Sequence, residues 1–318
     1  MQVEWPIVVV RFALYLDLML VFGLPLFGWY ALHGAERTSS LARQYLRWTM
    51  VAGVTGVLLS MLGMVAMAKA MSGASSYADL DAGILEAMVT GTGFGAAWSA
   101  RQAALLVGVL IALTPPGRSM LRFPLLALVG ALALSTLAWA GHGAMDDDGV
   151  RHASHLLVDI AHLLAAGAWV GALAAFVLLG NAARRETAQL RVLARTAERF
   201  ATPGTMMVAT LVVTGGANYW FIAGMPSISA MATPYGKLLL VKLTLFALML
   251  GMAATNRYRL TPKLVAAVQT GNTQDASRAL RRSLLCEMAT ATAVLMTVAV
   301  LGVASPDAQA NAPAASSR

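Results

Sequence analysis

The sequence predicts an all-α fold: a polytopic membrane protein in which eight transmembrane helices form a bundle and both termini face the periplasm. Three observations support this fold class. Of the 318 residues, 58% are hydrophobic and only 12% are charged, which is more apolar surface than a soluble domain can bury. The apolar residues fall into eight runs that are each long enough to cross a bilayer. Lysine and arginine gather in alternate loops between these runs.

The predicted spans form a single transmembrane domain, residues 1–304. Their approximate bounds are residues 7–31, 48–70, 97–113, 120–141, 154–179, 203–223, 236–255 and 284–304. The first apolar run is too long for a signal peptide and has no basic segment before it, so we expect a retained helix. Residues 84–95 are short and glycine-rich, which indicates a re-entrant or interfacial segment. The small polar residues of 305–318 predict a disordered periplasmic tail.

Basic residues decide the predicted orientation. Segments 33–47, 114–122, 181–200 and 256–283 contain 3, 2, 5 and 6 Lys or Arg, and the other loops contain almost none. The positive-inside rule places these four segments in the cytoplasm, and both termini in the periplasm. The net charge of +8 therefore reflects topology and contacts with lipid headgroups, and it does not indicate nucleic-acid binding.

Four of the five histidines lie close together, at positions 142, 152, 155 and 162. Residues His152, His155, Asp159 and His162 are separated by 3, 4 and 3 positions, so they share one face of a helix. At about 1.5 Å per residue, His162 lies roughly 12 Å into its span, near the middle of the hydrocarbon core. An ionisable side chain at that depth is costly and indicates function.

Imidazole, carboxylate and thioether groups together are the ligands that copper prefers. We expect a hydrated periplasmic mouth where copper first meets the protein, formed by His142, Met145, Asp146, Asp147, Asp148, His152 and His155. Deeper in the bundle, Asp159 and His162 would pass the ion inward or orient each other. Met64, Met67 and Met71 form a stripe on the span 48–70. Thioethers suit Cu(I), although a methionine stripe is also typical of helix packing.

Several other polar residues lie inside predicted spans. We expect Arg11 to reach the membrane surface, Asp17 to be satisfied inside the bundle, and Arg101 to need a carboxylate or carbonyl partner. Lys242 is a candidate partner for Asp159 or Asp17, and its helix face continues through Met249 to Asn256. Thr214 and Asn218 also share a face, which fits hydrogen bonding to a neighbouring helix. The single cysteine, Cys286, excludes an internal disulfide and a multi-cysteine metal site.

Two other functions remain open at this point. The same histidines could be axial ligands of haem in a membrane cytochrome, although only His162 lies deep in a span. The chain could also be a copper-holding assembly or sensing factor that transports nothing. The sequence contains no ATP-binding motif and no catalytic triad, so we do not expect an enzyme.

Several segments of the chain resemble the copper resistance protein D (CopD) family of bacterial inner-membrane proteins. These segments are GH at 141–142, HLLAAGAWVGAL at 162–173, RFATPGTMMVATLVVTGGANYW at 199–220, YGKLLLVKLTLFALMLGMAATNRYRLTP at 235–262 and TGTGFGAAWSAR at 90–101. The resemblance implies an inner-membrane copper homeostasis protein that moves copper inward and works with a separate periplasmic copper-binding protein (CopC). His142 and His162 match the family's histidines.

The sequence therefore predicts a copper permease of the cell inner membrane, with copper ions, a CopC-like protein and membrane lipids as its partners. The oxidation state of the copper and the energy source for transport remain open. The cytoplasmic exit is the weakest point of this model, because the sequence shows no ligand cluster there beyond Cys286.

Overall fold

The computed structural model describes residues 5–74, 76–114, 119–140, 149–184, 186–223 and 231–303. Within these ranges it is a helical protein without β-strands, and it contains eight helices that are long and apolar enough to cross a membrane. They contain α1 (Trp5–Ala31), α2 (Ser40–Ser72), α4 (Gly93–Leu113), α5 (Ser119–Ser135), α6 (Val150–Ala183), α8 (Ala201–Ala223), α10 (Pro234–Thr255) and α12 (Gln274–Leu301). The span of α5 continues to Ala140, and that of α10 continues to Thr270. The predicted fold class, a polytopic all-α membrane protein, is confirmed.

Shorter helical segments connect the long helices. They are η1 (Gly34–Thr38), η2 (Tyr77–Asp79), α3 (Ala82–Gly91), η4 (Thr136–Ala140), α7 (Thr187–Arg199), η6 (Asn256–Leu260) and α11 (Thr261–Thr270). The predicted interfacial segment corresponds to α3 and the start of α4. Thr92 separates these two helices: its hydroxyl accepts a hydrogen bond from the Gly95 backbone, which satisfies a free N–H group in the first turn of α4.

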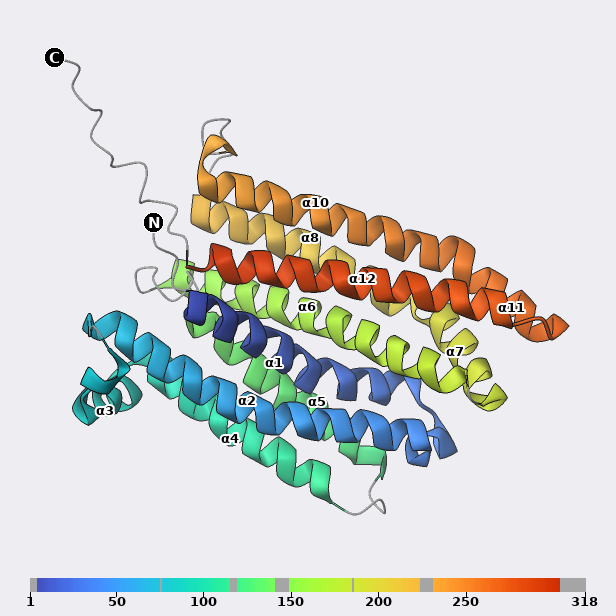
Figure 1. Ribbon diagram of the computed structural model, residues 1–318, viewed down its shortest axis with the longest axis horizontal. Helices are drawn as coiled ribbons and strands as arrows, with labels where there is room; N and C mark the ends of the chain where they lie inside the picture. Colours follow the sequence, from blue (N-terminus) through green and yellow to red (C-terminus); the bar gives the residue numbers. More distant parts are fainter. Residues whose placement is uncertain are drawn as a thin grey trace.

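The long helices lie roughly side by side, with α1 and α6 in the middle of the bundle (Figure 1). Helices α2 and α4 lie on one flank, and α8 and α10 lie on the other. We call the end of the bundle where α1 and α6 begin the Trp5 end, and the opposite end, which carries α7 and α11, the α7 end (Figure 1). Helix α6 thus runs from the Trp5 end to the α7 end, whereas α8 and α12 run back.

Helices α1 and α6 cross at glycine residues. A Cβ atom on Gly171 would lie 2.2 Å from the Cα atom of Gly23, and one on Gly23 would lie 2.3 Å from the Gly167 carbonyl oxygen. Only glycine permits this approach, because any side chain would overlap the facing backbone. Backbone contact at this point therefore fixes the central helix pair.

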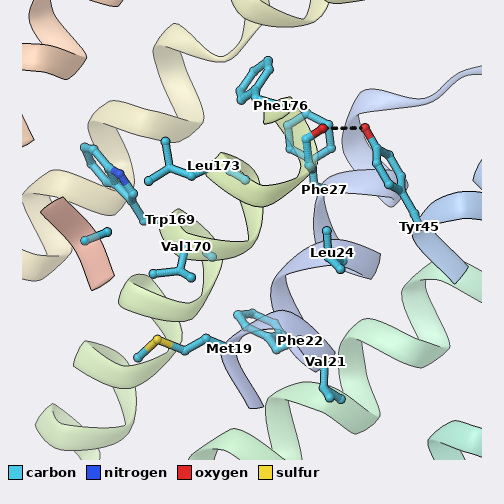
Figure 2. Close-up of a cluster of buried hydrophobic side chains, with 14 of the residues drawn as sticks. Met19, Val21, Phe22, Leu24, Phe27, Tyr45, Trp169, Val170, Leu173 and Phe176 are labelled. Carbon is cyan, nitrogen blue, oxygen red and sulfur yellow. Dashed lines mark hydrogen bonds between the residues drawn. The ribbon is translucent and has the colours of Figure 1, made fainter. Parts of the chain in front are cut away.

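Aromatic side chains fill the space beside this crossing, as Figure 2 shows. Phe27 and Phe176 meet edge to face, with their ring centroids 4.9 Å apart. The Tyr45 hydroxyl of α2 donates to the Ala175 carbonyl at 3.0 Å (Figure 2), so its buried polar atom is satisfied. This cluster anchors α2 to the central pair.

An ion pair ties the connecting segments together at the α7 end. The Arg195 guanidinium of α7 donates to both Glu36 carboxylate oxygens of η1, each at 2.7 Å. These hydrogen bonds hold the pKa of the Glu36 carboxyl below its ordinary value. The bidentate geometry makes this a stronger contact than a typical surface ion pair.

Candidate metal site between α6 and α8

The polar stripe of α6 faces α8 along the half of the bundle nearest the Trp5 end. Three of its residues each contact one side chain of α8, and we call these three contacts the ladder. They line up because the two helices run antiparallel and because the residues on each helix are separated by 4 and 3 positions. The ladder pairs are His155 with Phe221, Asp159 with Asn218, and His162 with Thr214.

His162 is held in one orientation by Thr214. Its Nδ1 atom lies 2.9 Å from the Thr214 hydroxyl oxygen, and that hydroxyl donates its only proton to the Thr210 carbonyl at 2.6 Å. Nδ1 must therefore be the donor to the hydroxyl oxygen, which leaves the lone pair of a neutral ring on Nε2. A neutral imidazole with a free Nε2 lone pair is suited to binding a metal ion.

Asp159 is the charged member of the ladder. One of its carboxylate oxygens accepts a hydrogen bond from the Asn218 amide at 3.0 Å. Lys242 of α10 lies close enough to interact electrostatically with both Asp159 and His162. The sequence left open whether Lys242 partners Asp159 or Asp17, and its electrostatic interaction is with Asp159. Asp159 and His162, which were expected to pass an ion inward or to orient each other, each have a hydrogen-bond partner on α8.

The two histidines nearer the Trp5 end have different surroundings. His155 was expected in a hydrated mouth, but only 2% of it is exposed. Its ring stacks on Phe221, with centroids 4.7 Å apart, because that aromatic ring covers it from α8. His152 is half-buried, and its Nδ1 atom has no hydrogen-bond partner among the described residues. His142, Met145 and the aspartates Asp146, Asp147 and Asp148 lie outside the described residues.

The methionine stripe lies in a different part of the molecule. Met64 and Met67 of α2 pack with Met88 of α3 and Trp98 of α4 in a small cluster, separate from the main core. Met71 is 67% exposed at the end of α2. The structure thus does not bring these methionines to the ladder, and it adds Met88, which the sequence analysis did not single out. Their role as ligands stays a prediction.

Two buried charged residues lie in the α1, α2, α4 half of the bundle. Arg101 donates to the Thr136 carbonyl at 3.4 Å, which is the expected kind of partner, and also to the Thr136 and Ser60 hydroxyls at 2.7 and 3.3 Å. Asp17 is 8% exposed, and its Oδ2 atom has no hydrogen-bond partner in the described ranges. The expectation that the bundle satisfies Asp17 is therefore not met by the described residues.

The ladder offers two metal-binding groups at one level of the bundle, the Asp159 carboxylate and the His162 imidazole. Within the part of the chain that the structure describes, no group of three or more His, Cys, Asp or Glu side chains is arranged to hold a metal ion. Two ligands of this kind suit an ion that is bound weakly and passed on.

Comparison with known protein families shows which family this chain belongs to. A model described as "Copper resistance protein D-like, N-terminal domain" matches residues 1–153, and one described as "Copper resistance protein D" matches residues 194–301. The chain belongs to the copper resistance protein D family. The resemblance inferred from the sequence is thus confirmed.

Three curated relatives agree with this assignment. Copper resistance protein D of Pseudomonas syringae pv. tomato is 44% identical over 95% of this chain and 97% of its own length. Inner membrane protein YebZ of Escherichia coli is 30% identical over 81% of this chain and 85% of its own. Copper transport protein CutJ of Bacillus subtilis is 31% identical over 73% of this chain and 40% of its own. No solved structure matches the chain.

The eight membrane-length helices and the relative named as an inner membrane protein bear out the expected location. The chain is a multi-pass protein of the cell inner membrane, and its family is named for copper resistance and copper transport.

Proposed function

We propose that this protein moves copper ions across the inner membrane, from the periplasm to the cytoplasm, along a path between α6, α8 and α10. The observation that carries this proposal is the ladder of α6 and α8, in which Asp159 and His162 are fixed inside a membrane-spanning bundle. Buried ionisable groups in transmembrane helices commonly mark an ion pathway. The positive-inside rule supports a periplasmic Trp5 end.

The positions of the polar groups suggest the order of events. Copper would arrive at the Trp5 end, where His142, Met145 and His152 are the proposed first ligands. It would then bind between Asp159 and His162, using the free Nε2 lone pair. Lys242 lowers the affinity at this point, because its positive charge competes with the metal ion for Asp159. An ion held by few ligands beside a competing cation is released readily, as transport requires.

A CopC-like periplasmic protein is the proposed copper donor at the Trp5 end. The relative named as a copper transport protein favours transport over a storage or sensing role. We propose no enzymatic activity, because the described polar groups suit the binding and release of an ion.

The methionine cluster is a second candidate Cu(I) site. Met64, Met67 and Met88 come from two helices and share one small cluster, and thioethers favour the cuprous ion. Replacing all three by leucine conserves most of the packing volume. Cu(I) bound to purified protein should fall in this variant if the cluster is a site, and it should not change if the cluster only packs.

Uptake of copper by vesicles containing the purified protein tests the main proposal. His162→Ala should reduce both bound copper and copper uptake, whereas His33→Ala at the α7 end should change neither. The proposal is wrong if both variants match the wild type. The visible absorption spectrum tests the haem alternative at the same time, because we expect no strong Soret band.

A further inference from the structure

A second buried carboxylate lies in the half of the bundle nearest the α7 end. Glu287 of α12 is 3% exposed. Its Oε1 atom accepts a hydrogen bond from the Trp169 indole at 3.1 Å, and its Oε2 atom accepts one from the Asn256 amide at 2.8 Å. Three different elements, α6, η6 and α12, thus meet at one acidic side chain. Burying such a group is costly, and an ionisable side chain inside a membrane span therefore indicates a function.

Asn256 has an unused acceptor beside this carboxylate. Its amide nitrogen donates to Glu287, but its Oδ1 atom is buried and has no hydrogen-bond partner in the described ranges. Asn256 is also the first residue of η6, where the backbone forms a short π-helix. π-Helical turns are rare and occur frequently at functional sites. An orphaned acceptor and an irregular backbone therefore coincide at the buried acid.

No basic side chain neutralises Glu287. Among the described residues it forms no ion pair, and every charged group on the neighbouring elements is engaged or directed elsewhere. Lys242 of α10 lies beside Asp159 and His162 of α6, and Lys237 of α10 is exposed. Arg151 of α6 donates to the Phe221 carbonyl. On α1, Arg11 donates to the Gly302 carbonyl and Asp17 lies against Gly56. On α12, Asp275 and Arg278 pair with each other, and Arg281 donates to Asn181. Arg257 of η6 donates to Thr205, and Arg259, Lys263 and Arg282 are exposed.

We propose that Glu287, together with Asn256 and Trp169, forms a reversible proton-binding site that controls the passage of copper. The control of copper passage rests on the proposed function, whereas the binding of a proton does not. The ligand is a proton, and it binds at Oε2. Trp169 can only donate to Oε1, whereas the Asn256 amide beside Oε2 has both a donor and an acceptor. The step is a simple protonation: Oε2 gains a proton from the solution at the α7 end and later returns it.

The neighbours of Glu287 can serve both of its states. The indole of Trp169 is only a donor, so it remains on Oε1 throughout. The amide of Asn256 carries a donor and an acceptor. Its nitrogen donates to the ionised carboxylate, and after the amide turns over, its Oδ1 atom accepts from the protonated acid. The orphaned Oδ1 atom thus receives a donor only when Glu287 carries a proton.

The site is also well placed to exchange protons and to sense the metal path. Glu287 lies five residues from Arg282, about 7.5 Å along α12 from that exposed residue. Helix η6 follows α10 directly, and Asn256 at its start continues the face of Lys242 and Met249, fourteen residues beyond Lys242. Lys242, Met249 and Asn256 therefore form a line along one helix face from the ladder to Glu287.

Infrared difference spectroscopy of the full-length protein tests this proposal directly. The difference between spectra recorded at low and high pH should contain a carboxylic-acid C=O band. The band should be lost in Glu287→Gln and retained in Asp17→Asn, because Asp17 is the other buried acidic side chain among the described residues. In Trp169→Phe the band should shift in frequency and persist to higher pH, because the ionised form has lost a donor. A spectrum of Glu287→Gln that matches the wild type would overturn the proposal.

Copper uptake measured across the same pH range separates the two proposals. Uptake by the wild type should change over the range in which the band titrates, and Glu287→Gln should abolish that pH dependence. An unaltered pH profile in Glu287→Gln would overturn the control of copper passage. If wild-type vesicles take up no copper while the band still titrates, transport is wrong and the proton site stands.

Discussion

The Nδ1 atom of His162 and the Thr214 hydroxyl are 2.9 Å apart, and this contact fixes both the orientation and the tautomer of the imidazole ring. The hydroxyl is itself engaged with the Thr210 carbonyl, so it cannot donate to the ring. The proposed metal-binding role of His162 thus depends on a neutral side chain from another helix.

Replacing Thr214 by valine should weaken copper binding by about tenfold or more, because partners that orient a metal-binding histidine typically contribute that much. Copper titration of the purified protein measures the effect. Thr210→Val is the matched control, since its hydroxyl bonds the Met206 carbonyl of its own helix and should be dispensable. Equal affinities for the two variants would contradict the assigned role of Thr214.

Replacing Lys242 by methionine should tighten copper binding and slow its release. The substitution removes the cation that competes for Asp159 while it retains most of the side-chain volume. Stopped-flow release of copper to a chelator measures the rate. Lys237→Met removes an exposed lysine one and a half turns away on the same helix and should leave the rate unchanged. A faster release from Lys242→Met would exclude the proposed competition.

Replacing Gly171 by alanine should destabilise the bundle by about 1–3 kcal/mol, the usual cost of overpacking a tight interior. The new methyl group would overlap the backbone of Gly23. Thermal unfolding in detergent measures the change. Gly251→Ala on α10 provides the control, because a Cβ atom there meets nothing within 4 Å. Similar unfolding temperatures for both variants would show that α1 and α6 separate more easily than the structure indicates.

The ion pair of Glu36 and Arg195 should make stability depend on pH in the acid range. Because the folded-state pKa of Glu36 is lowered, its stabilising contribution is present above the unfolded-state pKa of about 4.3. It is lost as the pH falls through the lower, folded-state value. For a partly exposed bidentate pair we expect about 1 kcal/mol. Unfolding of the wild type and Glu36→Gln should differ at pH 7 and converge in strong acid, whereas a constant difference would contradict the linkage.

Hydropathy was sufficient to predict the membrane-spanning helices but not their ends. Helix α2 begins at Ser40, whereas the apolar span was predicted from residue 48, and α12 begins at Gln274 rather than 284. The extra turns are polar and contain residues such as Arg43 and Arg278, which hydropathy excludes from a span. Such turns extend the helix beyond the hydrocarbon core, where polar side chains carry no penalty.

Spacing identified the face of α6 that carries the candidate site, because helical periodicity alone decides which side chains share a face. It could not identify the neighbour. That Phe221 of α8 would bury His155 follows from tertiary packing, which a single helix pattern does not contain. The division of the chain into a membrane domain at 1–304 and a tail at 305–318 also stays a prediction.

Glu287 was missed although a signal was available. It is an acidic residue inside a predicted apolar span, the same criterion that singled out Asp17 and Lys242. Met88 carried no comparable signal, because a methionine in a short apolar helix is unremarkable by composition. Its position beside Met64 depends on how α3 folds back on α2.

The glycine contact of α1 with α6 limits how the protein can change shape. Two helices whose backbones touch at Gly23 and Gly171 can neither slide nor rotate past each other without colliding. If the ladder opens on one side of the membrane and then on the other, as the proposed transport requires, the moving part must be on the flank, where α8 and α10 lie (Figure 1). In such a motion α1 and α6 would stay fixed, and α8 and α10 would move to open and close the path.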